Sequence, residues 1–208
     1  MVAVGMALAL WVAFTVVQDL WARTANKPQR VAALFGQPAS VWGMVLGHLG
    51  IAVFVVGVTL SKAYSTEEDV RMAPGQTLEL GGYGFQLVGV RETPGPNYTA
   101  HEGLVIVSRD GEEVTRLYPQ KRVYSVQGMP MTEAAIDPGL TRDLYVALGE
   151  PLPNGDWAVR LYHKPFVRWI WFGALFMALG GVLAAADRRY RILKRGATVP
   201  AGAVGAIT

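Results

Sequence analysis

The 208-residue chain contains no cysteine. It can therefore form no disulfide, thiolate metal site or sulfur-ligated cluster, and it has no cysteine nucleophile. Any thiol chemistry would need the thiols of a partner. The sequence also contains no phosphate-binding loop, no nucleophile elbow and no dinucleotide fingerprint. These absences argue against an enzyme that works alone.

Charged residues are scarce, at 17% of the chain, whereas hydrophobic residues make up 51%. Soluble domains average about 25% charged residues, so this composition indicates a protein that is partly embedded in a membrane. The net charge of +3 and the pI near 9.3 could suggest nucleic-acid binding. The basic residues, however, cluster beside the hydrophobic segments, where they set membrane topology, and we expect no nucleic-acid partner.

Three hydrophobic segments predict three transmembrane helices, at residues 1–21, 41–61 and 166–187. Each is close to the roughly 20 residues that cross a bilayer. A signal peptide has positive charges before its apolar core, whereas here they follow the core, so we expect the first helix to stay uncleaved.

The charges beside these segments predict the topology. Residues 22–40 contain basic residues and no acid, and residues 188–208 begin with a dense basic cluster. By the positive-inside rule, both segments are cytoplasmic. The segment between the second and third helices, residues 62–165, then lies outside, in the periplasm of a bacterium. Its ten Lys and Arg against fourteen Asp and Glu give it a net charge of −4.

Residues 62–165 are expected to form a β domain, because hydrophobic and polar residues alternate in stretches such as 77–80 and 85–88. Asp110-Gly111 and Asn154-Gly155 lie between such stretches and favour tight hairpin turns. We expect about five to eight short antiparallel strands in a small barrel or sandwich. The stretch 131–136 is expected to form one helical turn. The predicted fold is therefore three transmembrane helices with an inserted antiparallel β domain.

His48 is the one ionisable residue in the second hydrophobic segment. An ionisable residue inside a membrane is costly unless it is paired, so it is a functional-site hypothesis by default. Gly43, Gly47 and Gly50 would allow a helix backbone or a flat ligand to come close. Two roles are open for His48: an axial ligand of a haem iron, or a member of a helix-packing seam that bonds a neighbouring backbone group or hydroxyl. Chemistry alone favours packing.

Two further groups of candidate residues lie in the β domain. His101 and His163 have no second histidine or carboxylate nearby at zinc-ligand spacing, so we interpret them as surface or interface residues. A polar cluster could suggest paired carboxylates for acid–base chemistry. Its Asp-Pro-Gly sequence is typical of a turn, however, and its arginine can pair with either acid, so a structural role is expected. The cluster consists of Thr132, Glu133, Asp137, Arg142 and Asp143.

Four blocks of this sequence resemble the C-terminal part of the CcmF/NrfE family, the haem lyases of cytochrome c maturation. They occur in the family's order and with compatible spacing, and the resemblance runs from about residue 41 to residue 191. The blocks are WGMVLGHLGIAVFVVGVTLSKAYSTEEDVRMAPG, GPNY, MTEAAIDPGLTRDLYVALGE and WAVRLYHKPFVRWIW.

The resemblance implies a polytopic protein of the bacterial inner membrane. Such a protein receives haem from a periplasmic haem chaperone and joins the haem vinyl groups to the cysteines of apocytochrome c, which thiol-reducing maturation subunits prepare. It also holds a b-type haem of its own, and the family's ligand histidine in the His-Leu-Gly block matches His48. The lack of cysteine is consistent with this, since the reacting thiols belong to apocytochrome c.

The chain also departs from the family pattern. Members are much longer and carry further histidines and a tryptophan-rich periplasmic motif ending in Asp, which none of the six tryptophans here forms. We therefore expect a fragment that is inactive alone and pairs with the N-terminal part of the same haem lyase, which would hold the second axial histidine. The alternative is a non-redox, membrane-anchored binding module that docks apocytochrome c or another maturation subunit.

The predicted topology can be tested with alkaline phosphatase fusions, because this enzyme is active only on the periplasmic side. A fusion after Gly95 should be active and a fusion after Arg195 inactive. The opposite pattern of activities would contradict both the topology and the haem-lyase interpretation.

Overall fold

The computed structural model describes residues 1–126 and 128–187. The chain divides into two compact units. One contains residues 57–170 together with Met1 and Val2, and the other contains residues 3–56 and the chain from Trp171 onwards. The predicted cytoplasmic tail, residues 188–208, lies outside the described residues.

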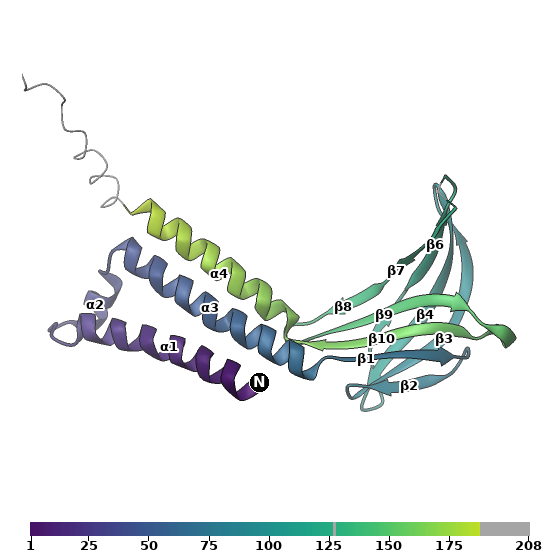
Figure 1. The fold of residues 1–208 in the computed structure, drawn as a ribbon, viewed down its shortest axis with the longest axis horizontal. Coiled ribbons are helices and arrows are strands. Elements are labelled where there is room, and N and C mark those ends of the chain that lie inside the picture. Colours follow the sequence, from purple (N-terminus) through teal and green to yellow (C-terminus); the bar gives the residue numbers. More distant parts are fainter. Residues whose placement is uncertain (127, 188–208) are drawn as a thin grey trace, which may run out of the picture. The chain divides into compact units, whose positions relative to one another are not determined.

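The helices agree with the three predicted spans to within a few residues. They are α1 (Val2–Thr24), α2 (Arg30–Phe35), α3 (Ala39–Tyr64) and α4 (Val167–Ala186) (Figure 1). In the described part of the chain, α1, α3 and α4 are long and apolar enough to cross a membrane. The short helix α2 lies in the loop between α1 and α3, where Pro28 and Pro38 prevent one long helix.

Helices α3 and α4 pack together at glycines that are spaced seven residues apart on each helix. A Cβ atom at Gly43 would lie 2.5 Å from the Gly180 carbonyl oxygen, and one at Gly50 would lie 2.7 Å from the Gly173 carbonyl oxygen. No real side chain fits at these distances, so the two backbones touch because glycine is present on both sides. Close backbone packing of this kind stabilises helix pairs in membranes, where apolar burial contributes little.

Gly50 and Gly47 form a matched pair for testing this seam. A Cβ at Gly47 would meet no atom within 4 Å, in contrast to one at Gly50. Gly50→Ala should therefore destabilise the helix pair by about 1–3 kcal/mol through overpacking. Gly47→Ala should be neutral or stabilising, because alanine favours the helix. Thermal unfolding of both variants in the same detergent checks this, and equal stabilities would show that α3 and α4 do not pack through Gly50.

The described residues of the β domain form ten strands, more than expected, in two antiparallel sheets (Figure 1). One sheet has the order β1-β10-β9-β8, and the other has the order β2-β3-β4-β6-β7, with β5 also paired to β4. The strands are β1 (Thr66–Met72), β2 (Thr77–Leu80), β3 (Tyr83–Pro94), β4 (Tyr98–Arg109), β5 (Glu112–Leu117), β6 (Gln120–Tyr124), β7 (Pro130–Glu133), β8 (Ala135–Pro138), β9 (Arg142–Pro151) and β10 (Trp157–Pro165).

The core of the β domain lies between the two sheets. The side chains that alternate inward from both sheets are fully buried, as the hydrophobic alternation predicted. The domain is therefore a sandwich. The largest of these buried side chains are Phe85, Met72, Leu87, Leu144, Leu148 and Leu161.

The helical turn expected over residues 131–136 is wrong. All of these residues except Ala134 belong to β7 or β8, which pair with β6 and β9. The helix-favouring residues of this stretch, Met131, Glu133 and the two alanines after it, suggested a local helix. Pairing with neighbouring strands overrides such weak propensities, and sequence-local reasoning could not include that pairing.

Both predicted turns have the left-handed backbone that they require. Asp110 and Gly111 have φ of 54° and 84° and form a two-residue turn between the paired residues Arg109 and Glu112. Asn154 and Gly155 have φ of 70° and 83°, but their loop is longer, since β9 and β10 first pair at Pro151 and Trp157.

Valine at both positions 154 and 155 should destabilise the β domain, because β-branched residues resist positive φ. We expect less protein to accumulate in the membrane, while the molecules that do fold keep their function. Valine at Glu112 and Glu113, in the exposed strand β5, is the control and should be tolerated. Normal amounts of the turn variant without cytochrome c maturation would make this loop a docking surface instead.

Candidate functional site

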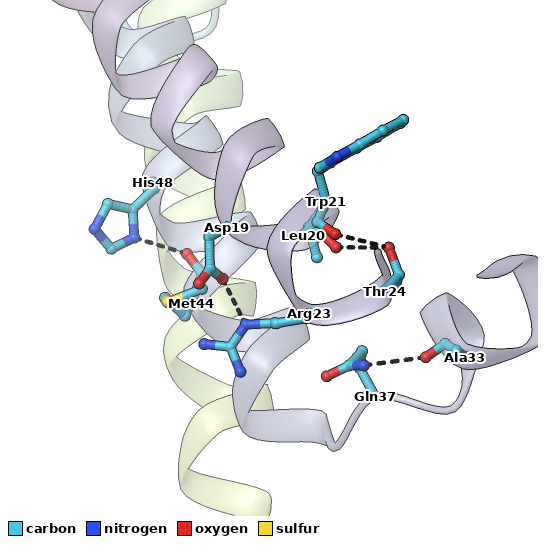
Figure 2. A network of polar contacts seen from close by, with 9 residues as sticks. All are labelled: Asp19, Leu20, Trp21, Arg23, Thr24, Ala33, Gln37, Met44 and His48. Carbon is cyan, nitrogen blue, oxygen red and sulfur yellow. Dashed lines mark hydrogen bonds and ion pairs between the residues drawn. The ribbon is translucent and has the colours of Figure 1, made fainter. Parts of the chain in front are cut away.

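His48 lies exposed on α3 with its ring projecting from the helix (Figure 2). Its Nδ1 lies 2.8 Å from the carbonyl oxygen of Met44, one turn earlier. A carbonyl oxygen can only accept, so Nδ1 carries the proton and Nε2 keeps a lone pair. A hydrogen bond of this kind is how proteins set the tautomer of a metal-binding histidine. The ring therefore presents one coordinating nitrogen away from its own helix.

The glycines of α3 do not line the histidine. The glycines were expected to admit either a helix backbone or a flat ligand. The structure shows a helix backbone, because Gly43 and Gly50 pack on α4. At 3.6 residues per turn, His48 points about 160° away from Gly50 around the helix axis. Ile51, one turn further on, is 41% exposed and continues the histidine's side of the helix. His48 is thus outside the α3–α4 seam, and its backbone partner belongs to its own helix.

Helix α1 contains an ion pair that was not predicted from the sequence. Arg23 donates from Nε to Asp19 Oδ2 at 2.6 Å (Figure 2). The signal was available, because an acid and a base four residues apart face each other on a helix. Both side chains are more than a third exposed, so the pair contributes little to stability. It marks the polar end of the first hydrophobic helix.

The two other histidines pack against aromatic rings. The His101 ring lies 5.3 Å from that of Trp157, and the His163 ring lies 5.8 Å from that of Tyr83, both measured between centroids. Among the described residues there is no group of three or more His, Cys, Asp or Glu that could hold a metal ion. Both histidines are half-buried, and each packs on one side against an aromatic ring of the β domain.

The polar cluster of the β domain is structural, as expected. Arg142 Nη1 pairs with Asp137 Oδ2 at 2.6 Å. Asp143 accepts a backbone N–H within its own loop, and Glu133 pairs with an arginine of β6. Thr132 bonds a carbonyl oxygen of β9 at 3.5 Å. The carboxylates are thus directed to different partners, so they form no acid–base pair.

A groove of about 630 Å³ lies over the four-stranded sheet and was not predicted. Small residues of β9 and β10 form its floor, including Ala147, Gly149 and Ala158. Tyr145 and Tyr162 meet edge to face at its side, with ring centroids 4.7 Å apart. Because its residues come from four strands, no local motif could have identified it. The groove offers aromatic and polar surface to a partner but no metal-binding histidine.

Comparisons with known proteins agree with this architecture. The family model described as the CcmF C-terminal beta-sandwich matches residues 63–165. The chain is 56% identical over 185 residues to the cytochrome c-type biogenesis protein CcmF of Pseudomonas aeruginosa. The match covers 89% of this chain and 28% of that relative. The chain belongs to the CcmF family. It corresponds to the C-terminal part of the CcmF sequence.

Other relatives support the same assignment. CcmF of Escherichia coli is 48% identical over 191 residues, 92% of this chain and 28% of the relative. The cytochrome c-type biogenesis protein NrfE of Haemophilus influenzae is 32% identical over 179 residues, 86% of this chain and 26% of the relative. The chain thus spans little more than a quarter of the length of these proteins.

A solved structure shows the same fold. The cytochrome c haem lyase CcmF matches with a TM-score of 0.68 and 20% sequence identity, over 86% of this chain and 29% of that one. The fold of apolar helices with an antiparallel β sandwich is therefore confirmed. With three helices in its described part that can span a bilayer, this CcmF family member is a membrane protein.

Proposed function

We propose that this chain is the C-terminal portion of a haem lyase in which His48 supplies one axial ligand to a b-type haem. The observation that carries the proposal is the exposed Nε2 of His48, left free by the hydrogen bond from Nδ1 to Met44. A neutral imidazole with its second nitrogen fixed in this way has the chemistry of a haem ligand. When bound, the haem would supply one-electron chemistry.

The surroundings of His48 are suited to such a group. Ile51, about one turn away, is exposed and would provide apolar surface for a flat macrocycle. The Met44 carbonyl orients the ring, and the helix seam on the other side of α3 leaves the histidine's side unobstructed by α4. The chain's own residues would therefore hold and orient the haem and exclude water from one side of it.

The second axial histidine would come from outside these 208 residues. The sequence contains only three histidines, and His101 and His163 pack against aromatic rings in the β domain. The relatives are more than three times as long as their match to this chain, so their N-terminal part has room for the missing ligand. We infer that the site is completed at an interface with that part, and that this chain is inactive alone.

The charge pattern supports an inner-membrane location with the β domain in the periplasm. The loop 22–40 is basic, whereas residues 62–165 carry a net charge of −4. In this orientation the β domain would meet the periplasmic haem chaperone, apocytochrome c and the thiol-reducing maturation subunits. The relatives are a cytochrome c-type biogenesis protein and a cytochrome c haem lyase, which supports a role in cytochrome c maturation.

The groove supports a second candidate function. Its tyrosines and small floor residues suit contact with an extended polypeptide, and it holds no haem-ligating histidine. Under this alternative the chain is a non-redox, membrane-anchored module that docks apocytochrome c or another maturation subunit. The two functions differ in whether His48 binds haem, and both can operate in one assembly.

Replacing His48 in the complex of this chain with the N-terminal part separates the two functions. His48→Ala should reduce the b-type haem content by about tenfold or more, as for removal of a direct ligand, while insertion in the membrane is unchanged. Exogenous imidazole should restore part of the haem spectrum. The Soret band of the purified complex is the measurement.

Two variants serve as controls. His101→Ala and His163→Ala should leave the haem spectrum unchanged, because both side chains pack against aromatic rings in the β domain. A normal Soret band and a normal yield of cytochrome c in the His48→Ala complex would show that the histidine binds no haem. The docking function would then remain.

A further inference from the structure

Two arginines converge on one tyrosine oxygen in the β domain. The hydroxyl of Tyr83 accepts a hydrogen bond from Arg109 Nη1 and one from Arg142 Nε, each 3.2 Å long. Tyr83 is only 6% exposed. Burial raises the pKa of Tyr83, but the bonds from Arg142 and Arg109 outweigh it, so that the pKa lies below its ordinary value. This shift reflects the positive potential at the phenol oxygen.

The positive charge at this point is only partly balanced. Arg142 has Asp137 at 2.6 Å. Arg109, whose side chain is 58% exposed, has Asp110 at 3.6 Å, and the Asp110 side chain is 92% exposed. In the described part of the chain, no acceptor takes the hydroxyl proton of Tyr83. Guanidinium groups beside a hydroxyl whose proton has no acceptor have the chemistry of an anion site.

The neighbouring histidine adds no negative charge. His163 lies against the Tyr83 ring. Burial, followed by the charges of Arg142 and Arg109, lowers the pKa of His163, which favours its neutral form. Of the two arginines, Arg142 is thus closely paired with Asp137, whereas Arg109 has only the exposed Asp110 as a counter-ion, and a bound anion would balance its charge more fully.

Strand pairing places this cluster at the membrane end of the β domain. His163 pairs with Thr66, the second residue after α3 ends at Tyr64. β10 then ends at Pro165, just before α4 begins (Figure 1). Around these junctions lie the aromatic and basic side chains that are typical of a bilayer interface: Tyr64, Phe166, Trp169, Lys62 and Arg168.

We propose that Tyr83, Arg109 and Arg142 bind the phosphate of an anionic phospholipid. Lipid phosphates are the anions most concentrated at a membrane surface, and planar guanidinium groups match their oxygens. Arg142 pairs with Asp137 and joins the two sheets through Tyr83. Arg109 is more than half exposed, so it can turn from Tyr83 and Asp110 towards a headgroup. The contact would hold this end of the β domain at the bilayer surface. It does not depend on the proposed role of His48.

The full chain in detergent, supplied with defined lipids, tests this site. Native mass spectrometry would count retained phosphatidylglycerol against phosphatidylcholine in wild type, Arg109→Gln and Tyr83→Phe. Arg116→Gln is the matched control. Arg116 lies in β5, the strand paired with the β4 strand of Arg109, is 55% exposed and pairs with Glu113 of its own strand. A parallel titration with inorganic phosphate distinguishes a lipid headgroup from a free anion.

Wild type should retain phosphatidylglycerol over phosphatidylcholine, and Arg109→Gln should weaken retention about fivefold, the effect of one surface arginine. Tyr83→Phe should weaken it too, and Arg116→Gln should leave it unchanged. Equal losses in Arg109→Gln and Arg116→Gln would overturn the proposal, as would binding of inorganic phosphate without lipid preference. If Tyr83→Phe fails to fold, the two arginine variants still decide.

Discussion

The proposed site depends on the hydrogen bond between the His48 ring and the Met44 carbonyl oxygen. It places the proton on Nδ1 and leaves Nε2 as the coordinating atom, directed away from the helix. Because donor and acceptor are one turn apart in the same helix, the arrangement needs no neighbour. The ring is thus oriented before any partner arrives, which lowers the entropic cost of binding a ligand.

The packing of α3 complements this arrangement. Glycines on one side of the helix bring it into backbone contact with α4, and the histidine lies nearly opposite. Since the seam lies nearly opposite His48, it can hold the helix pair together without occupying the surface beside the histidine. One helix therefore combines a side that packs on α4 with a side that carries the exposed His48, and the β sandwich lies between α3 and α4 in the sequence.

The sequence predicted the elements that depend on composition and local pattern. Hydrophobic length located three helices, alternation indicated the sandwich, and Asp110-Gly111 identified a hairpin turn. Residues 131–136 were predicted wrongly, because pairing with β6 and β9 decides their conformation. The groove and the Tyr83 cluster could not be predicted, because each collects residues from strands distant in sequence. His48 was identified as a candidate, but only the helix packing shows that Gly43 and Gly50 face α4.

A cryo-electron microscopy structure of this chain assembled with the N-terminal part of the haem lyase would test the central claim most directly. We expect haem iron bound to Nε2 of His48, with Nδ1 still donating to the Met44 carbonyl and a histidine of the N-terminal part on the opposite face of the haem. A haem held elsewhere in the assembly, with the His48 ring in contact only with lipid or packed side chains, would contradict it.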